Sequence, residues 1–112
     1  MKRSALFAEI IKNYRRHGWA LRRVLLRAET GAELGDAGAA ELFENALRED
    51  SEVDALWFAR PSHAGREAWE LRLVAETPYA LFETFEPDEA EEEREELRRE
   101  MEARLRDYAS RA

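Results

Sequence analysis

Between Val53 and Glu86, apolar and polar residues alternate with a period of two, which is the pattern of strands in a half-buried sheet. Three such runs occur, VDALWFAR, AWELRLVA and YALFETFE, and they are separated by PSHAGR and by a break at Thr77-Pro78. Proline cannot donate to a strand ladder, so Pro78 marks a turn. The stretch is therefore predicted to be an antiparallel meander of three strands.

Two registers of the first hairpin fit this pattern. Pairing Phe58 with Trp69 places Leu56, Phe58, Trp69 and Leu71 on one face of the sheet. A slip of one residue pairs Trp57 with Trp69 instead, and it moves the side chains of one strand to the opposite face. In either register a large aromatic side chain lies on each face.

The third strand also has apolar side chains on both faces. Tyr79, Leu81 and Phe85 point to one face and Phe82 points to the other, because successive side chains alternate along a strand. Both faces of the sheet are therefore expected to be covered, either by helices or by another subunit.

The segment before the meander predicts a helix followed by a strand. Apolar residues at helical spacing lie on one face of the first helix, and Gly18 ends it; they are Leu6, Phe7, Ile10, Ile11 and Tyr14. The run from Trp19 to Ala28 fits a second helix almost as well as a strand. We favour a strand, because a glycine stop precedes it.

If the run is extended, Val24 and Leu26 point to one face of the sheet, and Leu21 and Leu25 point to the other. The next segment, from Thr30 to Gly38, has three glycines in nine residues and is predicted to be a loop. A short helix is then expected from Asp36 to about Arg48.

The last segment, from Glu89 to Ala112, has no glycine or proline and is predicted to be one long helix. Its glutamates are concentrated in the first turns, where they favour the helix dipole. Residues 1–112 are thus expected to form a single α+β domain. The fold has an N-terminal helix, an antiparallel sheet of three to four strands that ends in the meander, and a long C-terminal helix.

The charge is distributed unevenly around a net value of −7. Through Ala28 there are eight lysines and arginines and one acid, Glu9, whereas the rest has ten arginines and twenty-four acids. The two parts are expected to attract each other, within one chain or across a dimer.

Several classes of protein are disfavoured by composition. There is no cysteine, so disulfides and thiolate metal sites are impossible, and a cytoplasmic location is expected. The N-terminus lacks the unbroken apolar run of a signal peptide, and no membrane-spanning segment is expected. No cofactor or metal motif is present: His17 and His63 cannot form a zinc site without carboxylates.

One pattern resembles the active site of a metal-dependent nuclease. Metal-dependent nucleases place an aspartate near one strand and a Glu-x-Lys on the next, so that two carboxylates hold the metal. Here Asp54 precedes Glu70-Leu71-Arg72, and Glu9 could be an additional helical acid. Arginine is a poor substitute for the lysine because it does not lose its proton. A solvated Glu70 and Arg72 face explains the same residues, so no catalytic residue is assigned.

The preferred interpretation is a small acidic protein-interaction or self-associating module without catalysis. Apolar surface left over by the helices predicts a homodimer, or binding to another protein, with Trp57 and Phe82 as contact residues. Arg22 and Arg23 are candidates for an electrostatic contact. A nucleic-acid partner is not expected, because the net negative charge repels it.

Overall fold

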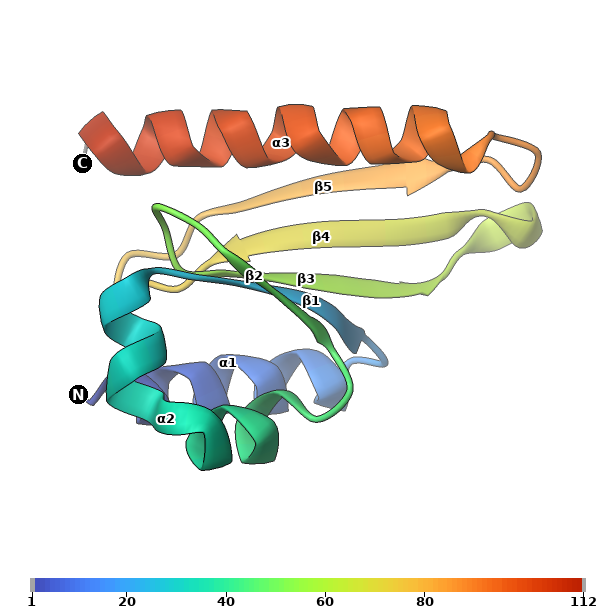
Figure 1. The fold of residues 1–112 in the computed structure, drawn as a ribbon. Coiled ribbons are helices and arrows are strands. Elements are labelled where there is room, and N and C mark those ends of the chain that lie inside the picture. Colours follow the sequence, from blue (N-terminus) through green and yellow to red (C-terminus); the bar gives the residue numbers. More distant parts are fainter. Residues whose placement is uncertain (1, 112) are drawn as a thin grey trace.

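The computed structural model describes residues 2–111 and contains three helices and five strands (Figure 1). In chain order these elements are α1 (Arg3–Arg16), β1 (Ala20–Leu26), α2 (Ala28–Phe43), β2 (Leu47–Asp50), β3 (Ala55–Pro61), a short 3₁₀ turn (His63–Gly65), β4 (Glu67–Leu73), β5 (Ala80–Phe85) and α3 (Glu91–Arg111).

The strands form one sheet in the order β2-β1-β3-β4-β5. β1 and β2 are parallel, and the other neighbours are antiparallel. α1 and α2 lie on one side of the sheet and α3 lies on the other (Figure 1). The predicted α+β class, the two terminal helices and the β3-β4-β5 meander are confirmed. The sheet has five strands, one more than the upper limit expected.

The additional strand, β2, lies where the predicted second helix was expected to end. The loop predicted from Thr30 to Gly38 is wrong, because this segment is helical apart from a kink at Gly35, where φ is +71°. Its alanines, glutamates and leucines favour a helix and outweigh the other glycines. The helix then ends at Phe43 instead of about Arg48, and Leu47–Asp50 pairs with β1.

The run after Gly18 is extended, as predicted, and β1 pairs with both β2 and β3. Val24 and Leu26 pack on the α1 side and Leu25 packs on the α3 side. Leu21, however, packs on the α1 side, so its predicted face is wrong. The register between β1 and β3 shifts between Leu21 and Arg23, and this bulge reverses the alternation of side chains.

The register of the β3-β4 hairpin differs from both of the proposed registers. Trp57 lies opposite Leu71 and Phe58 lies opposite Glu70. Trp57 and Trp69 therefore share the α3 side, as the second register predicted, and their rings are 5.8 Å apart in an edge-to-face arrangement. The first register, which placed Trp69 and Leu71 on the face of Leu56 and Phe58, is wrong. The second register had the correct faces but was offset by two residues along the strand.

Two apolar clusters result, one on each face of the sheet. On the α1 and α2 side the buried residues include Phe7, Ile10, Ile11, Phe43, Leu56 and Phe58. On the α3 side they include Trp57, Trp69, Leu71, Phe85, Met101 and Leu105. Both faces are thus covered by helices of the same chain, which confirms that both need a cover.

α3 covers its face of the sheet with charged as well as apolar side chains. Arg98 is 1% exposed; it donates to Glu91 and Glu95, and its guanidinium carbon lies 4.0 Å from the centre of the Trp69 ring. Glu102 is 3% exposed and accepts the Trp57 indole N–H at 2.8 Å. The narrow apolar stripe of α3 is therefore supplemented by paired polar groups.

Trp57→Phe tests the importance of the bond to Glu102. We expect it to lower the free energy of unfolding by about 1.5–3 kcal/mol, because it leaves a buried carboxylate short of a donor. Trp69→Phe is the matched control, since it removes the same ring volume and a bond to the partly exposed Glu67. Chemical denaturation measures both, and equal losses would contradict the prediction.

Candidate functional site

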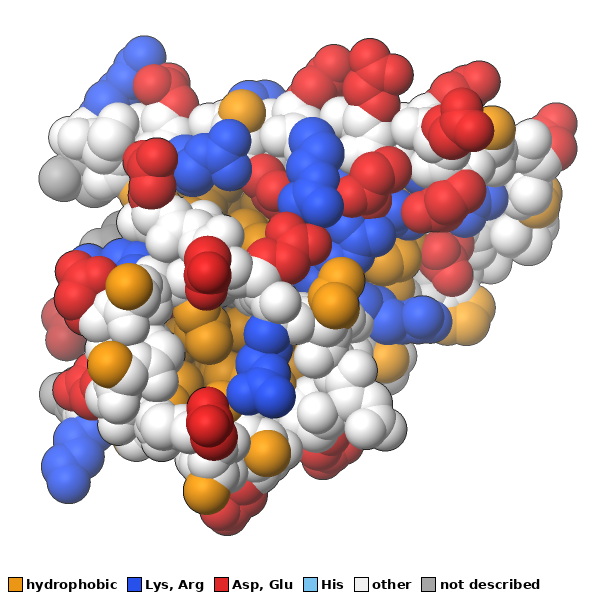
Figure 2. Space-filling model, viewed as in Figure 1, with side chains coloured by type: hydrophobic (Ala, Val, Ile, Leu, Met, Phe, Trp, Pro, Cys, Tyr) orange, Lys and Arg blue, Asp and Glu red, His pale blue; other side chains and the backbone are white. Residues whose placement is uncertain are grey.

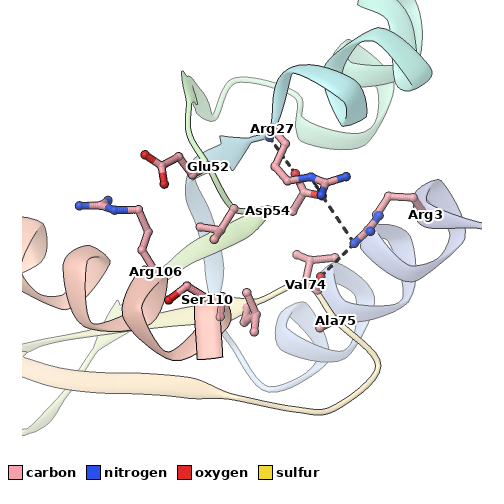
Figure 3. Close-up of a pocket in the computed structure, with 11 residues that line it drawn as sticks. Arg3, Arg27, Glu52, Asp54, Val74, Ala75, Arg106 and Ser110 are labelled. Atoms are coloured by element: carbon pink, nitrogen blue, oxygen red, sulfur yellow. Dashed lines mark hydrogen bonds and ion pairs between the residues drawn. The ribbon is translucent and has the colours of Figure 1, made fainter. Parts of the chain in front are cut away.

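A cavity of about 310 Å³ lies beside Asp54, where the beginnings of α1 and α2 approach the end of α3 (Figure 3). The Asp54 carboxylate is buried and fully engaged. One oxygen accepts the Arg27 backbone N–H at 2.9 Å, and the other accepts the Thr30 hydroxyl at 2.7 Å. Arg3 lies 3.5 Å from the second oxygen.

These contacts give Asp54 a structural role. It links the start of α2 to the start of β3, and its negative charge lies at the N-terminal end of the α2 dipole. Arg3 also donates to the backbone oxygen of Val74, which joins α1 to the end of β4. Sequence reasoning identified Asp54 but not its partners, since no local pattern links Arg3, Arg27 and Thr30 to it.

The nuclease-like residues do not converge. Glu70 lies opposite Phe58 in the middle of β4, whereas the backbone oxygen of Asp54 accepts from Val74, four residues further along the chain and just past the end of β4. At about 3.3 Å per strand residue, that places the two acids roughly 13 Å apart. Among residues 2–111 no group of three acids, histidines or cysteines could hold a metal.

The other members of that set have separate positions. Glu70 accepts a hydrogen bond from the Tyr14 hydroxyl, which ties α1 to the sheet. Burial raises the pKa of Tyr14, and the contact with Glu70 raises it further. Arg72 donates to the adjacent Leu73 carbonyl, and Glu9 is exposed on α1.

The four predicted partner-binding residues differ in exposure. The expectation that Trp57 lies at the surface is wrong: it is 0% exposed, because it packs beneath α3. Arg23 lies under the same helix and pairs with Glu95 at 2.8 Å. Arg22 is exposed at the β1 bulge, and Phe82 is exposed on β5, at 56%.

The expected attraction between the basic first quarter and later acids is present within the chain. Four of its eight basic residues form such ion pairs: Arg3 and Arg27 with Asp54, Arg15 with Glu44, and Arg23 with Glu95. The Arg15–Glu44 pair is exposed on both sides and contributes about 0–1 kcal/mol, whereas the pairs of Asp54 and of Arg23 are partly buried.

Phe82 lies on the strand at one edge of the sheet. β5 pairs only with β4 among the described strands, so its outer side is free. The Phe82 ring lies 6.3 Å from that of Trp19, and the Arg60 guanidinium lies 4.5 Å from the Trp19 ring centre. The sequence did not predict that Trp19 or Arg60 lies near Phe82, because only the tertiary fold brings these residues together.

The backbone of β5 has a defined set of outward groups. The Leu73 N–H donates to the Tyr79 oxygen, so Tyr79 and every second residue after it bond to β4. Ala80, Phe82 and Thr84 alternate with these residues and direct their N–H and C=O groups away from the sheet. We refer to these three residues and their outward groups as the β5 edge.

The opposite edge of the sheet is short and charged. β2 contains four residues, and three of them are the charged Arg48, Glu49 and Asp50. Short, charged edge strands disfavour pairing with another chain. β5 has six residues with a single charge, Glu83, and therefore lacks this protection.

Comparisons with protein-family models, curated proteins and solved structures found no match to this chain. In the part of the chain that the structure describes, no helix is both long and apolar enough to span a membrane.

Asp54→Asn tests whether Asp54 is structural or metal-binding. We expect a loss of about 2–3 kcal/mol in the free energy of unfolding. The asparagine NH₂ group would replace one of the two carboxylate oxygens that accept from the Arg27 N–H and the Thr30 hydroxyl. Glu52→Gln, in the same cavity but exposed, should change it by less than about 0.5 kcal/mol. A Mn²⁺-dependent rise in melting temperature that Asp54→Asn abolishes would support the nuclease hypothesis instead.

The ion pairs beneath α3 predict a pH dependence of stability. Burial opposes ionisation of Glu95, but hydrogen bonds from Arg23 and Arg98 outweigh it and lower its pKa to about 2. A lowered carboxyl pKa stabilises the fold above the unfolded value, about 4.5, and this contribution is lost as the pH falls toward 2.

We therefore expect Glu95→Gln to cost on the order of 1–2 kcal/mol at pH 7, after allowance for solvent screening, and little at pH 2. Glu96→Gln is the control, because Glu96 is exposed and makes no ion pair within residues 2–111. Urea titrations at several pH values measure the difference between each variant and the unmodified chain. A difference that stays constant with pH would contradict the prediction.

Proposed function

We propose that this protein is a protein-interaction module without catalysis and that the β5 edge is its binding surface. The observation that carries the proposal is the exposure of Phe82, at 56%, on an edge strand whose outer hydrogen-bonding groups have no strand beside them. The exposed ring provides an apolar anchor, and the unpaired backbone groups of the edge strand provide a template for strand pairing.

The mode of binding follows from the geometry of the edge. A partner strand that pairs with β5 would bond to the outward N–H and C=O groups of Ala80, Phe82 and Thr84. Its side chains on the α1 side would meet Phe82 and the neighbouring Trp19. Main-chain bonds would supply affinity, and the aromatic pair would supply selectivity for apolar side chains.

The buried charged groups support a role without catalysis. Each Asp54 oxygen accepts a hydrogen bond, from the Arg27 N–H or the Thr30 hydroxyl, and Arg3 lies within ion-pair distance. Glu102 is bonded to Trp57 and Arg99. Groups engaged in this way hold elements together and are not available to a substrate. A cytoplasmic site of action is part of the proposal, and the cysteine-free sequence supports it.

Photo-crosslinking at single positions tests this proposal. A photoreactive phenylalanine analogue replaces either Phe82 or Leu47, which are almost equally exposed on opposite edges of the sheet. In extracts of the cells that produce the protein, position 82 should form discrete protein adducts and position 47 should not. The adducts from position 82 should disappear with Thr84→Pro, because proline lacks an N–H for the partner strand.

The melting temperature of each variant confirms that it is folded. Thr84→Pro is a suitable blocking variant because the Thr84 N–H points outward and makes no bond to β4. Adducts that form equally at both positions, or that persist in Thr84→Pro, would show that the β5 edge is not the binding surface.

A further inference from the structure

We propose that the β5 edge binds the β5 edge of a second copy of this chain. This inference rests on the proposed function and names its partner. The two strands pair antiparallel about a two-fold axis that is perpendicular to the sheet and passes at Phe82. The two five-stranded sheets then form one continuous sheet.

The backbone selects this register. Ala80, Phe82 and Thr84 are the residues of β5 with outward N–H and C=O groups. A two-fold axis at Phe82 places Phe82 opposite Phe82 of the second copy, and Ala80 opposite Thr84. All three residues then exchange both bonds with a partner. An axis at Leu81 or Glu83 leaves one of the three residues without a partner.

The side chains agree with the same register. The two Phe82 rings meet on the α1 side, where each is exposed in the single chain and lies beside Trp19. Ala80 and Thr84 are small and do not obstruct the approach. An axis at Glu83 would instead place two carboxylates directly opposite each other, which is unfavourable.

The same axis brings the two α3 helices to one face of the joined sheet in antiparallel orientation. α3 has six acids and three arginines from Glu91 to Glu100, but two acids and three arginines from Met101 to Arg111. Figure 2 shows acidic side chains gathered over the amino-terminal half of α3 and arginines toward its middle and carboxyl end. Antiparallel helices place the acidic half of one beside the more basic half of the other.

One flank of α3 faces β5. Tyr108 stacks on Tyr79, just before β5, with ring centres 3.7 Å apart. The opposite flank faces β2, where Arg99 pairs with Glu49 at 2.9 Å. At helical spacing, the flank toward β5 contains Glu93, Leu97, Glu100, Arg104, Tyr108 and Arg111.

The contacts of β5 with α3 set the level at which the two helices would pair. Tyr79 is level with Tyr108, and Phe85 lies beneath Arg94 and Arg98, whose guanidinium carbons are 5.6 and 5.2 Å from its ring centre. Phe82, midway along the strand, is therefore level with about residue 102 of α3.

A two-fold axis at that level pairs complementary residues. Glu100 then faces Arg104 of the second copy, Glu93 faces Arg111, and Leu97 faces Tyr108. Within residues 2–111, Glu93, Glu100 and Arg104 make no ion pair. On the flank that faces β2, by contrast, Glu95 and Arg99 are paired within the chain. This self-complementarity is the reason to name a second copy as the partner.

Analytical ultracentrifugation of the purified chain, from low to high micromolar concentration, tests the inference. We expect a reversible dimer of the 13.1 kDa chain. Phe82→Arg and Thr84→Pro should each weaken dimerisation by about tenfold or more, as should Glu100→Arg, which places two arginines together. The double variant Glu100→Arg, Arg104→Glu should restore dimerisation, because it exchanges the two charges.

Leu47→Arg is the control on the opposite edge and should leave the dimer unchanged. A chain that stays monomeric throughout, a dimer that is insensitive to Thr84→Pro, or a double variant as weak as Glu100→Arg alone would overturn the inference. If the chain is monomeric but position 82 still crosslinks to a different protein, the second copy is excluded as partner while the proposed function stands. If the chain forms neither a dimer nor crosslinks from position 82, both the second-copy inference and the proposed function are overturned.

Discussion

The fold depends on a central strand that is apolar on both faces. Residues 55 to 59 of β3 are at most 1% exposed, so both faces of the sheet must be removed from water. A strand with this pattern cannot lie in a sheet with one solvated face. It requires a layer of helix on each side, and the chain supplies one layer before the meander and the other after it (Figure 1).

The two layers meet this requirement by different chemistry. α1 and α2 bring phenylalanine, isoleucine and alanine side chains to the sheet, and their cluster is almost entirely apolar. α3 buries Arg98 and Glu102 together with Met101 and Leu105. The guanidinium of Arg98 lies over the Trp69 ring, and Glu102 receives the Trp57 indole N–H. Large aromatic side chains with a polar atom allow a highly charged helix to cover a sheet.

The features that depend on local periodicity were predictable from the sequence. The meander, the terminal helices and the strand after Gly18 follow from changes in the spacing of apolar residues, because this spacing reflects which side chains meet a core. The offset of the β3-β4 hairpin and the face of Leu21 were not predictable. The first depends on the turn between the strands and the second on the β1 bulge, and periodicity alone determines neither.

The candidate sites were also difficult to predict, because the residues that contact them are distant in the sequence. Asp54 was conspicuous as an acid beside a strand, but its role is determined by Thr30 and Arg27, which are distant in the sequence. Trp57 was assigned to the surface because the assumed hairpin register left it on the face away from the main core. Its partner Glu102 lies 45 residues later, and no local pattern indicated that α3 covers it. Phe82 is exposed, since its side of β5 holds only small or polar neighbours, Ala80 and Thr84, and its role in binding stays a prediction.

The asymmetry of α3 links the packing of the sheet to its proposed association. On the flank toward β2, Glu95 and Arg99 are paired with each other and with Arg23 of β1 and Glu49 of β2. On the flank toward β5, Glu93, Glu100 and Arg104 extend into solvent next to an edge strand with free backbone groups. The sheet must bury both its faces, but this constraint leaves its edges free. β2 is short and charged, so the unprotected backbone groups and the unpaired charges lie together on the β5 side.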